Sequence, residues 1–381
     1  MNGGKPEPVA FVYTPDFQRY VLRAGHPFSP ARVEATRSLA QALGLGGLAE
    51  VRPRPATWEE LRSAHSEAYL QALRAASDGK AVRRLEDYGL GTPDTPVSPG
   101  IFEASAITAG GTLSAAREIL SGRYRKAVNL AGGLHHAQRD RAAGFCTVSD
   151  LSVAAREFTR AGWRVAYLDV DAHHGDGVQW LHYDDPNVMT ISWHETGRHL
   201  FPGTGFTYEL GRGHGIGTAL NVPLEPYTGD ASFLSAVDRV LEPALAWFRP
   251  DVILLQAGAD AHRLDPLADL NLTRQGFARV FERIVQAADR YTAGRLLATG
   301  GGGYATFHVV PRVWATLLAA LTGQDLPPRS PEQWLEAWRP RSEEPIPAPM
   351  DDPPEPGARE VEIGLANERT VDRLLHDWRT V

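Results

Sequence analysis

Histidine and aspartate residues follow short apolar runs of the chain at spacings that suit metal binding. The clearest group is Asp171-Ala-His173, which comes directly after the apolar run 165–168. Residues at i and i+2 of an extended segment point to the same side, so this aspartate and histidine can share one metal ion. Asp260 follows another apolar run and can supply a third ligand. Three protein ligands with an open position for water are typical of a catalytic metal site.

The ligand types limit which metal the site would hold. Nitrogen and oxygen ligands without sulfur suit Zn²⁺, and they also suit Fe²⁺, Co²⁺ or Mn²⁺. Cys146 is the only cysteine of the chain, which excludes a cysteine-based zinc cluster and an intrachain disulfide. We interpret Cys146 as a small buried filler, and a single cysteine fits a reducing cytoplasm.

Two adjacent histidines, His135 and His136, follow a third apolar run. Asp169 and Asp176 are their natural carboxylate partners, because a carboxylate behind an imidazole fixes its tautomer and raises its basicity. One histidine of the pair could then take a proton from water and return it to a leaving amine. Taken alone, a histidine in such a position is equally typical of a core residue that is hydrogen-bonded to the backbone.

Tyr304 follows four consecutive glycines, which allow a close approach of the backbone to a ligand. A tyrosine in that position can direct its hydroxyl toward a developing oxyanion. Taken alone, the motif is also typical of a packed aromatic side chain after a loop. Four further residues are predicted to line a narrow apolar channel that would suit the aliphatic stem of a lysine, namely Gly144, Phe145, Phe201 and Leu267.

The elements that must position these groups alternate along the chain. Apolar runs without polar alternation are typical of strands buried on both faces, and they are expected at Val9–Tyr13, Lys126–Leu130, Arg164–Asp169, Val188–Ser192, Val252–Gln256 and Arg295–Ala298. Helices are expected at Trp58–Ala76, at Gly100–Leu120 and after Thr273 as N-cap. This order predicts an α/β fold with a mainly parallel central sheet flanked by helices on both faces. The carboxyl ends of its strands should bring the polar segments to one site.

The chain is predicted to form one catalytic domain over residues 1–323. A proline-rich extension, residues 324–381, is expected to wrap this domain irregularly and to end in a helix near Glu368–Trp378. The net charge of −7 and the lack of a basic stripe argue against nucleic-acid binding. No long apolar run and no signal peptide are visible, so we expect a cytoplasmic protein without a membrane span.

Taken together, these segments resemble the histone deacetylase superfamily, in particular its bacterial acetoin-utilisation branch. The resemblance runs through most of the chain, and its motifs are specific in combination. They are His26-Pro-Phe-Ser-Pro-Ala-Arg32, Tyr88-Gly-Leu-Gly91, Gly133-Leu-His135-His136, Gly144-Phe-Cys146, residues 169–177, residues 194–205, Gly258-Ala-Asp260-Ala-His262 and Gly300 to Tyr304.

The resemblance implies an arginase-like fold and zinc-dependent hydrolysis of acetyl-lysine to lysine and acetate. It implies the same metal ligands, with His136 as the likelier acid and base of the pair, Tyr304 polarising the carbonyl and Asp94 gripping the substrate at the rim. It also implies structural K⁺ near Asp169, Asp171, His173, Ser192 and Trp193. The chain departs from the family at Ser149, where relatives usually carry asparagine.

Three other functions compete with a protein deacetylase. An acetylpolyamine deacetylase would share every catalytic residue and differ only at the rim. A two-metal ureohydrolase needs further carboxylates, but Gly175 and His262 stand where these would lie. A non-catalytic binder of acyl-lysine should lack a ligand or the tyrosine, and neither is lacking. The resemblance favours an acetylated protein or peptide as substrate, such as an acetylated acyl-CoA synthetase.

Overall fold

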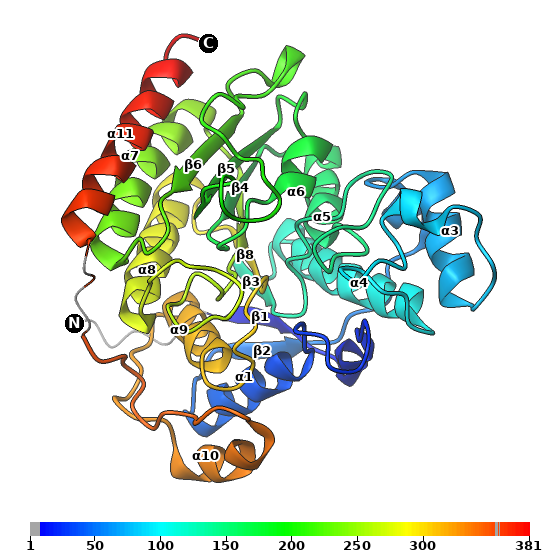
Figure 1. The fold of residues 1–381 in the computed structure, drawn as a ribbon, viewed down its shortest axis with the longest axis horizontal. Helices are drawn as coiled ribbons and strands as arrows, with labels where there is room; N and C mark the ends of the chain where they lie inside the picture. Colours follow the sequence, from blue (N-terminus) through cyan, green and yellow to red (C-terminus); the bar gives the residue numbers. More distant parts are fainter. Residues whose placement is uncertain (1–7, 355–356, 358) are drawn as a thin grey trace.

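The computed structural model describes residues 8–354, 357 and 359–381, and it shows one sheet of eight parallel strands (Figure 1). The order across the sheet is β2-β1-β3-β8-β7-β4-β5-β6. This confirms the predicted parallel sheet. Its strands are β1 Val9–Val12, β2 Leu48–Val51, β3 Lys126–Asn129, β4 Val165–Asp169, β5 Val188–Glu195, β6 Ala219–Leu224, β7 Val252–Gln256 and β8 Leu296–Thr299.

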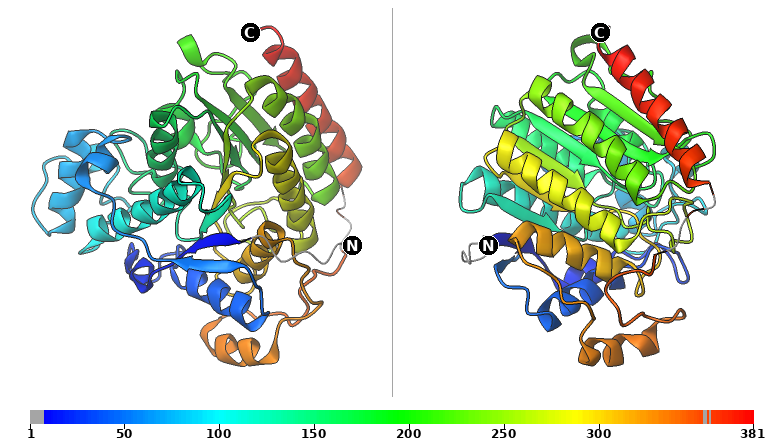
Figure 2. Two further views of the ribbon diagram at one scale, coloured as in Figure 1. Left: turned by 180° about the vertical axis from the view of Figure 1, so that it is seen from behind. Right: turned by 90° about the vertical axis from the view of Figure 1, so that its left-hand side faces the viewer.

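Helices cover both faces of the sheet, as the two turned views show (Figure 2). Because both faces are covered, the strands alternate between two apolar cores: Leu168 of β4 lies in one and its neighbour Tyr167 in the other. One core is completed by α1 Ala31–Ala42, α7 Asp230–Phe248, α8 Arg274–Tyr291 and α9 Val310–Thr322. The other is completed by α4 Ile101–Leu120, α5 Asp150–Arg160 and α6 Asp176–Leu181.

The prediction of one continuous helix at Trp58–Ala76 is wrong, because two helices occupy this segment. They are α2 Trp58–Arg62 and α3 Glu67–Ser77. The hydroxyl of Ser66 accepts the N–H of Tyr69 and so caps a new helix. Between the two helices, the buried His65 side chain contacts the carbonyl of Gln138 at 2.9 Å. A local cap and this inward-facing histidine outweigh the continuous helical pattern of the sequence.

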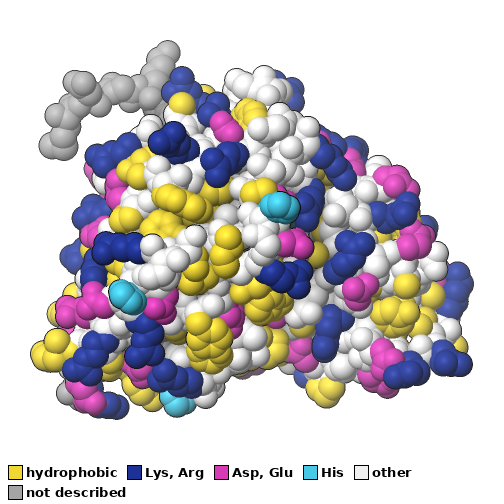
Figure 3. Space-filling view, turned by 90° about the horizontal axis from the view of Figure 1, so that it is seen from above, with side chains coloured by type: hydrophobic (Ala, Val, Ile, Leu, Met, Phe, Trp, Pro, Cys, Tyr) yellow, Lys and Arg dark blue, Asp and Glu magenta, His cyan; other side chains and the backbone are white. Residues whose placement is uncertain are grey.

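Four short 3-10 helices and two helices of the extension complete the part of the chain that the structure describes. The last helix, α11, spans Glu360–Trp378 and so begins earlier than the predicted start at Glu368. The 3-10 helices are η1 Pro15–Arg19, η2 Leu85–Tyr88, η3 Gly213–Gly215 and η4 Arg339–Arg341, and the other helix of the extension is α10 Glu332–Trp338. On the face seen in Figure 3, basic and acidic side chains are interspersed with hydrophobic ones.

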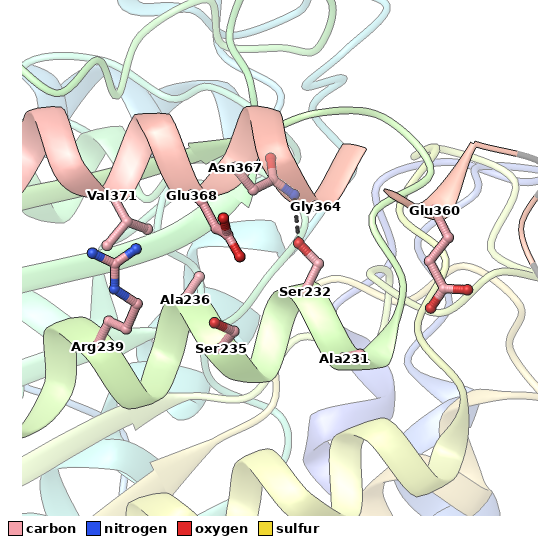
Figure 4. A pocket seen from close by; sticks show the side chains of 10 residues that line it. All are labelled: Ala231, Ser232, Ser235, Ala236, Arg239, Glu360, Gly364, Asn367, Glu368 and Val371. Carbon is pink, nitrogen blue, oxygen red and sulfur yellow. Dashed lines mark hydrogen bonds between the residues drawn. The ribbon is translucent and has the colours of Figure 1, made fainter. Parts of the chain in front are cut away.

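Helix α11 lies along α7 and beside strand β6, so the extension forms part of the layered fold. Asn367 joins the two helices, because its amide donates to the hydroxyl of Ser232 at 2.9 Å (Figure 4) and to that of Thr228 at 2.8 Å. The described part of the chain has no helix long and apolar enough to cross a membrane.

A second anchor of the extension is the buried carboxylate of Asp352. It accepts hydrogen bonds from His262 at 2.9 Å, from Arg312 at 2.9 Å and from the backbone N–H of Arg274 at 2.7 Å. Burial alone would raise the pKa of Asp352, but His262 and Arg312 outweigh it and hold the pKa well below its ordinary value. The extension is therefore fixed to the core by an ionised side chain.

We expect Asp352→Asn to lower the free energy of unfolding by about 3 kcal/mol at pH 7, because Arg312 keeps its buried charge without a carboxylate to compensate it. A carboxyl whose folded pKa is depressed stabilises the fold above its unfolded pKa of about 3.9, and this contribution is lost below it. The difference between variant and wild type should thus shrink as the pH falls below about 4. Urea unfolding across this pH range measures it, with the exposed Asp325→Asn as control. A difference that does not change with pH would contradict this origin.

Candidate active site

Three potential metal ligands converge where two neighbouring strands end. Asp171 and His173 follow β4, and Asp260 follows β7. After β4 the chain continues to β5 on one side, and after β7 it continues to β8 on the other side. Parallel sheets form ligand sites at such a change of direction. One ligand atom from each residue lies within 4.8 Å of the others. The Nδ1 atom of His173 is 2.9 Å from a carboxylate oxygen of Asp260 and 3.2 Å from one of Asp171.

The remaining carboxylate oxygens are held by hydrogen bonds from the protein. Asp171 accepts the side-chain amide of Gln256 at 2.6 Å and the backbone N–H of Gly302 at 2.7 Å. Asp260 accepts the backbone N–H of Ala172 at 2.9 Å. Such contacts behind metal ligands fix their orientation. Sequence reasoning missed Gln256, because nothing in the sequence of β7 shows that its last side chain faces a carboxylate of β4.

These residues fit a divalent cation. All three are buried, and their donor atoms are imidazole nitrogen and carboxylate oxygen. Burial and the neighbouring Asp171 raise the pKa of Asp260 to about 7. Two buried carboxylates so close together are stabilised by a shared cation, which offsets both the desolvation and the repulsion.

Each of the adjacent histidines has its own carboxylate partner. The Nδ1 atom of His135 is 2.9 Å from Asp169, and that of His136 is 2.7 Å from Asp176. The two imidazole rings are 4.0 Å apart, and the Nε2 atom of His135 lies 3.8 Å from Asp171. Both rings thus lie beside the metal-ligand cluster with their Nδ1 atoms engaged.

The two histidines differ in charge. Burial disfavours the charged form of His135, but Asp171 and Asp169 outweigh it and raise its pKa to about 9. Burial and the neighbouring His135 lower the pKa of His136 to about 4, although Asp176 acts in the opposite direction. These surroundings therefore favour the neutral form of His136 more than that of His135. Paired groups with divergent pKa values are typical of acid–base sites.

A buried carboxylate holds the turn that presents the histidine pair. Asp150 accepts the backbone N–H groups of Gly133 at 3.0 Å and Leu134 at 2.8 Å, as well as the hydroxyl of Thr112. Sequence reasoning missed this role of Asp150. Its neighbour Ser149 caps α5 by accepting the N–H of Ser152 at 3.3 Å.

Aromatic rings surround the approach to the histidines and the metal ligands. Phe201 packs perpendicular to His136 at 5.0 Å between ring centroids, and it is 46% exposed, which places it at the mouth. Phe145 lies 5.6 Å from the ring of Tyr304, and Tyr304 lies 6.5 Å from the ring of His173. These ring contacts place Phe145, Phe201 and Tyr304 around the histidines and the potential metal ligands.

Asp94 and Leu267, which were also predicted to contact the substrate, are both half-buried. Asp94 accepts the backbone N–H of Gly144 at 2.8 Å, so it holds the segment that carries Gly144 and Phe145. Leu267 is half-buried, and its N–H donates to Asp265 at 3.1 Å. The same aspartate accepts the backbone N–H of Tyr304 at 2.7 Å. Asp265 was missed by sequence reasoning, and it ties Leu267 to the tyrosine.

The residues predicted to lie near K⁺ adjoin the metal-ligand segment. Ser192 of β5 is the register partner of Asp169 in β4. Its hydroxyl is 2.8 Å from the ring of His194, and Trp193 is fully buried, with its indole N–H donating to the carbonyl of Ala236. Ser192 and Trp193 therefore lie beside the segment that carries Asp171 and His173.

Gly144 allows His136 to lie against the channel wall. Its φ is +51°, and an added Cβ would lie 2.2 Å from the Cδ2 atom of His136. We expect Gly144→Ala to lower the rate of any reaction that uses this histidine by about 100-fold, the low end for positioned acid–base groups. The matched control is Gly79→Ala, where φ is +73° and an added Cβ meets nothing within 4 Å. Equal rates in the two variants would contradict this role of Gly144.

The sequence of this chain matches a known protein family. The model of the histone deacetylase domain matches residues 26–321. The acetoin utilization protein AcuC of Bacillus subtilis is 42% identical over 97% of this chain and 97% of its own length, and AcuC of Staphylococcus xylosus is 38% identical over 96% and 97%.

Solved structures agree with these relatives. The crystal structure of a histone deacetylase homologue from Aquifex aeolicus aligns with a TM-score of 0.85 at 30% identity, and it covers 96% of this chain and 100% of that one. A histone deacetylase homologue complexed with SAHA aligns with the same TM-score at 31% identity. The fold is therefore the arginase-like fold that the sequence predicted, and the chain belongs to the histone deacetylase family of hydrolytic deacetylases.

Proposed function

We propose that this protein hydrolyses the acetyl-lysine amide of proteins or peptides to lysine and acetate, with one Zn²⁺ held by Asp171, His173 and Asp260. The observation that carries the proposal is the convergence of this cluster with His135 and His136, with aromatic rings packed beside them. We propose that these rings line a narrow channel. A narrow channel of this kind suits an unbranched aliphatic chain that carries an amide at its tip.

The chain's own residues then have distinct tasks. The channel rings of Phe145 and Phe201 hold the lysine stem and exclude water. His136, neutral and hydrogen-bonded to Asp176, takes a proton from the attacking water at Nε2. The hydroxyl of Tyr304 donates to the oxygen of the carbonyl under attack. A protonated histidine of the pair returns a proton to the leaving amine.

The metal would supply Lewis-acid chemistry, since a bound divalent cation polarises carbonyl groups and lowers the pKa of water to about 7. Fe²⁺ or Co²⁺ would fit the same donors. We further propose structural K⁺ near Asp169, Asp171, His173, Ser192 and Trp193, because the strand register places Asp169 opposite Ser192.

Two features bear on the competing functions. His262, which stands where a second metal would need a carboxylate, is instead hydrogen-bonded to Asp352. This supports one metal per chain and disfavours the ureohydrolase. The name of the relatives, acetoin utilization protein AcuC, supports a role in acetoin utilisation. We further propose a cytoplasmic location and an acetylated metabolic enzyme, such as an acyl-CoA synthetase, as the substrate. An acetylpolyamine would compete for the same catalytic groups.

The direct test is acetate release from an acetyl-lysine peptide by metal-stripped protein, before and after one equivalent of Zn²⁺. We expect release only with the metal, and saturation at one metal per chain. Acetylspermidine offered in parallel distinguishes the small-molecule alternative by its kcat/KM. Release from neither substrate under any of the candidate metals would overturn the proposal and would favour the non-catalytic acyl-lysine binder.

A further inference from the structure

A surface cavity of about 570 Å³ lies outside the candidate active site, next to the carboxyl ends of β1 and β2. Its walls come from residues 14–19 after β1, residues 52–58 after β2, helix α3 and the start of α4. None of the residues assigned above to the candidate active site lines it. Its volume falls within the range of about 300–1,000 Å³ that is common for small-molecule sites. We call it the arginine cavity.

The floor of the arginine cavity is apolar. Phe102, Ala106 and Ile107 lie on consecutive turns of α4, and all three are buried or nearly so. Ala56 and Trp58 continue this surface from the segment after β2. A ligand that covered the floor would therefore need an apolar or aromatic body.

The rim of the arginine cavity is basic, although the whole chain carries a net charge of −7. Four arginines line the cavity with two carboxylates, Asp16 and Glu103. Because Glu60 pairs with one of these arginines, the remaining excess is one positive charge. The arginines are Arg19, Arg52, Arg54 and Arg74. Such a local excess attracts anions against the field of the rest of the molecule.

These arginines are not equally available to a ligand. Arg54 is engaged by Glu60, with two nitrogen–oxygen distances of 2.8 and 2.5 Å. Arg19 lies 3.9 Å from Asp16, and both side chains are more than half exposed, so this pair holds the guanidinium weakly. Arg52 and Arg74 form no ion pair within residues 8–354, 357 and 359–381.

Arg74 is held in place without being neutralised. Its guanidinium carbon lies 5.3 Å from the ring centroid of Phe102 and 5.8 Å from that of Trp58. Cation–π contacts of this kind position a guanidinium while its charge remains uncompensated by a carboxylate. Its N–H donors are therefore free to bind an oxyanion in the two-pronged geometry that guanidinium groups favour.

We propose that the arginine cavity binds a small organic phosphate whose phosphate group lies on Arg52 and Arg74 and whose apolar or aromatic body covers the α4 floor. A phosphate group can accept from two guanidinium groups at once, because it has three acceptor oxygens and a charge of about −2 at neutral pH. The body contributes because Phe102, Ala106 and Ile107 offer apolar surface in the same cavity. This site is separate from the deacetylation site and does not depend on the function proposed for it.

Isothermal titration calorimetry of the full chain with adenosine 5′-monophosphate tests the proposal, with adenosine and inorganic phosphate titrated separately. We expect the nucleotide to bind more tightly than either part. Arg52→Ser and Arg74→Met should each weaken binding about tenfold, the factor for losing one charge-assisted contact. The matched control is Arg379→Ser, which removes the same charge from an exposed site at the end of α11.

The reciprocal variant is Glu103→Gln. It removes a carboxylate from the cavity wall and should tighten nucleotide binding several-fold, which no loss of folding could mimic. Acetate release from a peptide should be unchanged in all four variants, so it reports that they are folded. The proposal is overturned if the wild-type protein gives no binding heat at millimolar nucleotide. It is also overturned if Arg379→Ser weakens binding as much as the cavity variants, or if Glu103→Gln leaves it unchanged.

Discussion

Replacing Asp260 with alanine is expected to abolish both zinc retention and acetate release. The change removes one of three metal ligands and leaves the N–H of Ala172 without its acceptor. Loss of a hydrogen-bond partner behind a metal ligand costs about 10–100-fold in affinity or activity, so loss of the ligand should exceed about 100-fold. Metal content after dialysis and acetate release from an acetyl-lysine peptide measure the two effects on one sample.

The matched control for this variant is Asp269→Ala. Asp269 is exposed on the same segment, and its replacement removes the same charge without touching a ligand. We expect this control to keep one zinc per chain and wild-type turnover. Wild-type zinc affinity in the Asp260 variant would show that the metal lies elsewhere.

Replacing Tyr304 with phenylalanine should lower kcat by about 10²–10³-fold, the usual cost of removing one donor from an oxyanion site. The ring contacts with Phe145 and His173 remain, so KM and zinc content should hardly change. Burial and the carboxylate of Asp260 raise the pKa of Tyr304 well above its ordinary value. The hydroxyl therefore stays protonated and can donate across the neutral pH range.

Steady-state kinetics separate this role from a purely structural one. A structural defect would raise KM or lower zinc content, whereas loss of the donor lowers kcat alone. The exposed Tyr227→Phe, which deletes a hydroxyl on the surface, is the control and should behave as wild type. Unchanged kcat in the Tyr304 variant would remove the tyrosine from the mechanism.

Six of the eight strands could be predicted from the sequence because they are buried on both faces and read as continuous apolar runs. The two that were missed, β2 and β6, are the edge strands of the sheet. The side chains of β2 are partly exposed, and β6 contains Pro223, which only an edge strand tolerates. β2 therefore lacks the apolar signal of a central strand, whereas β6 is buried but its apolar run is interrupted by Asn221 and Pro223.

Those residues of the candidate site that directly follow predicted strands could be identified from the sequence. The parallel sheet brings Asp171, His173 and Asp260 together, and this required only the fold class. The supporting contacts of Gln256 and Asp265 could not be predicted, since each joins segments that only the three-dimensional fold places side by side. The same holds for Asp352, which reaches His262 from the proline-rich extension.

The strand order has a consequence for how the protein is made. Strand β3, which leads into the histidine pair, lies between β1 and β8, and β8 is the last strand of the chain to be synthesised. A nascent chain on the ribosome therefore exposes one backbone edge of β3 until translation has passed residue 299. Pairing over such a long sequence separation is slow. We expect a chain cut before β8 to aggregate or recruit chaperones rather than to yield a partly active enzyme.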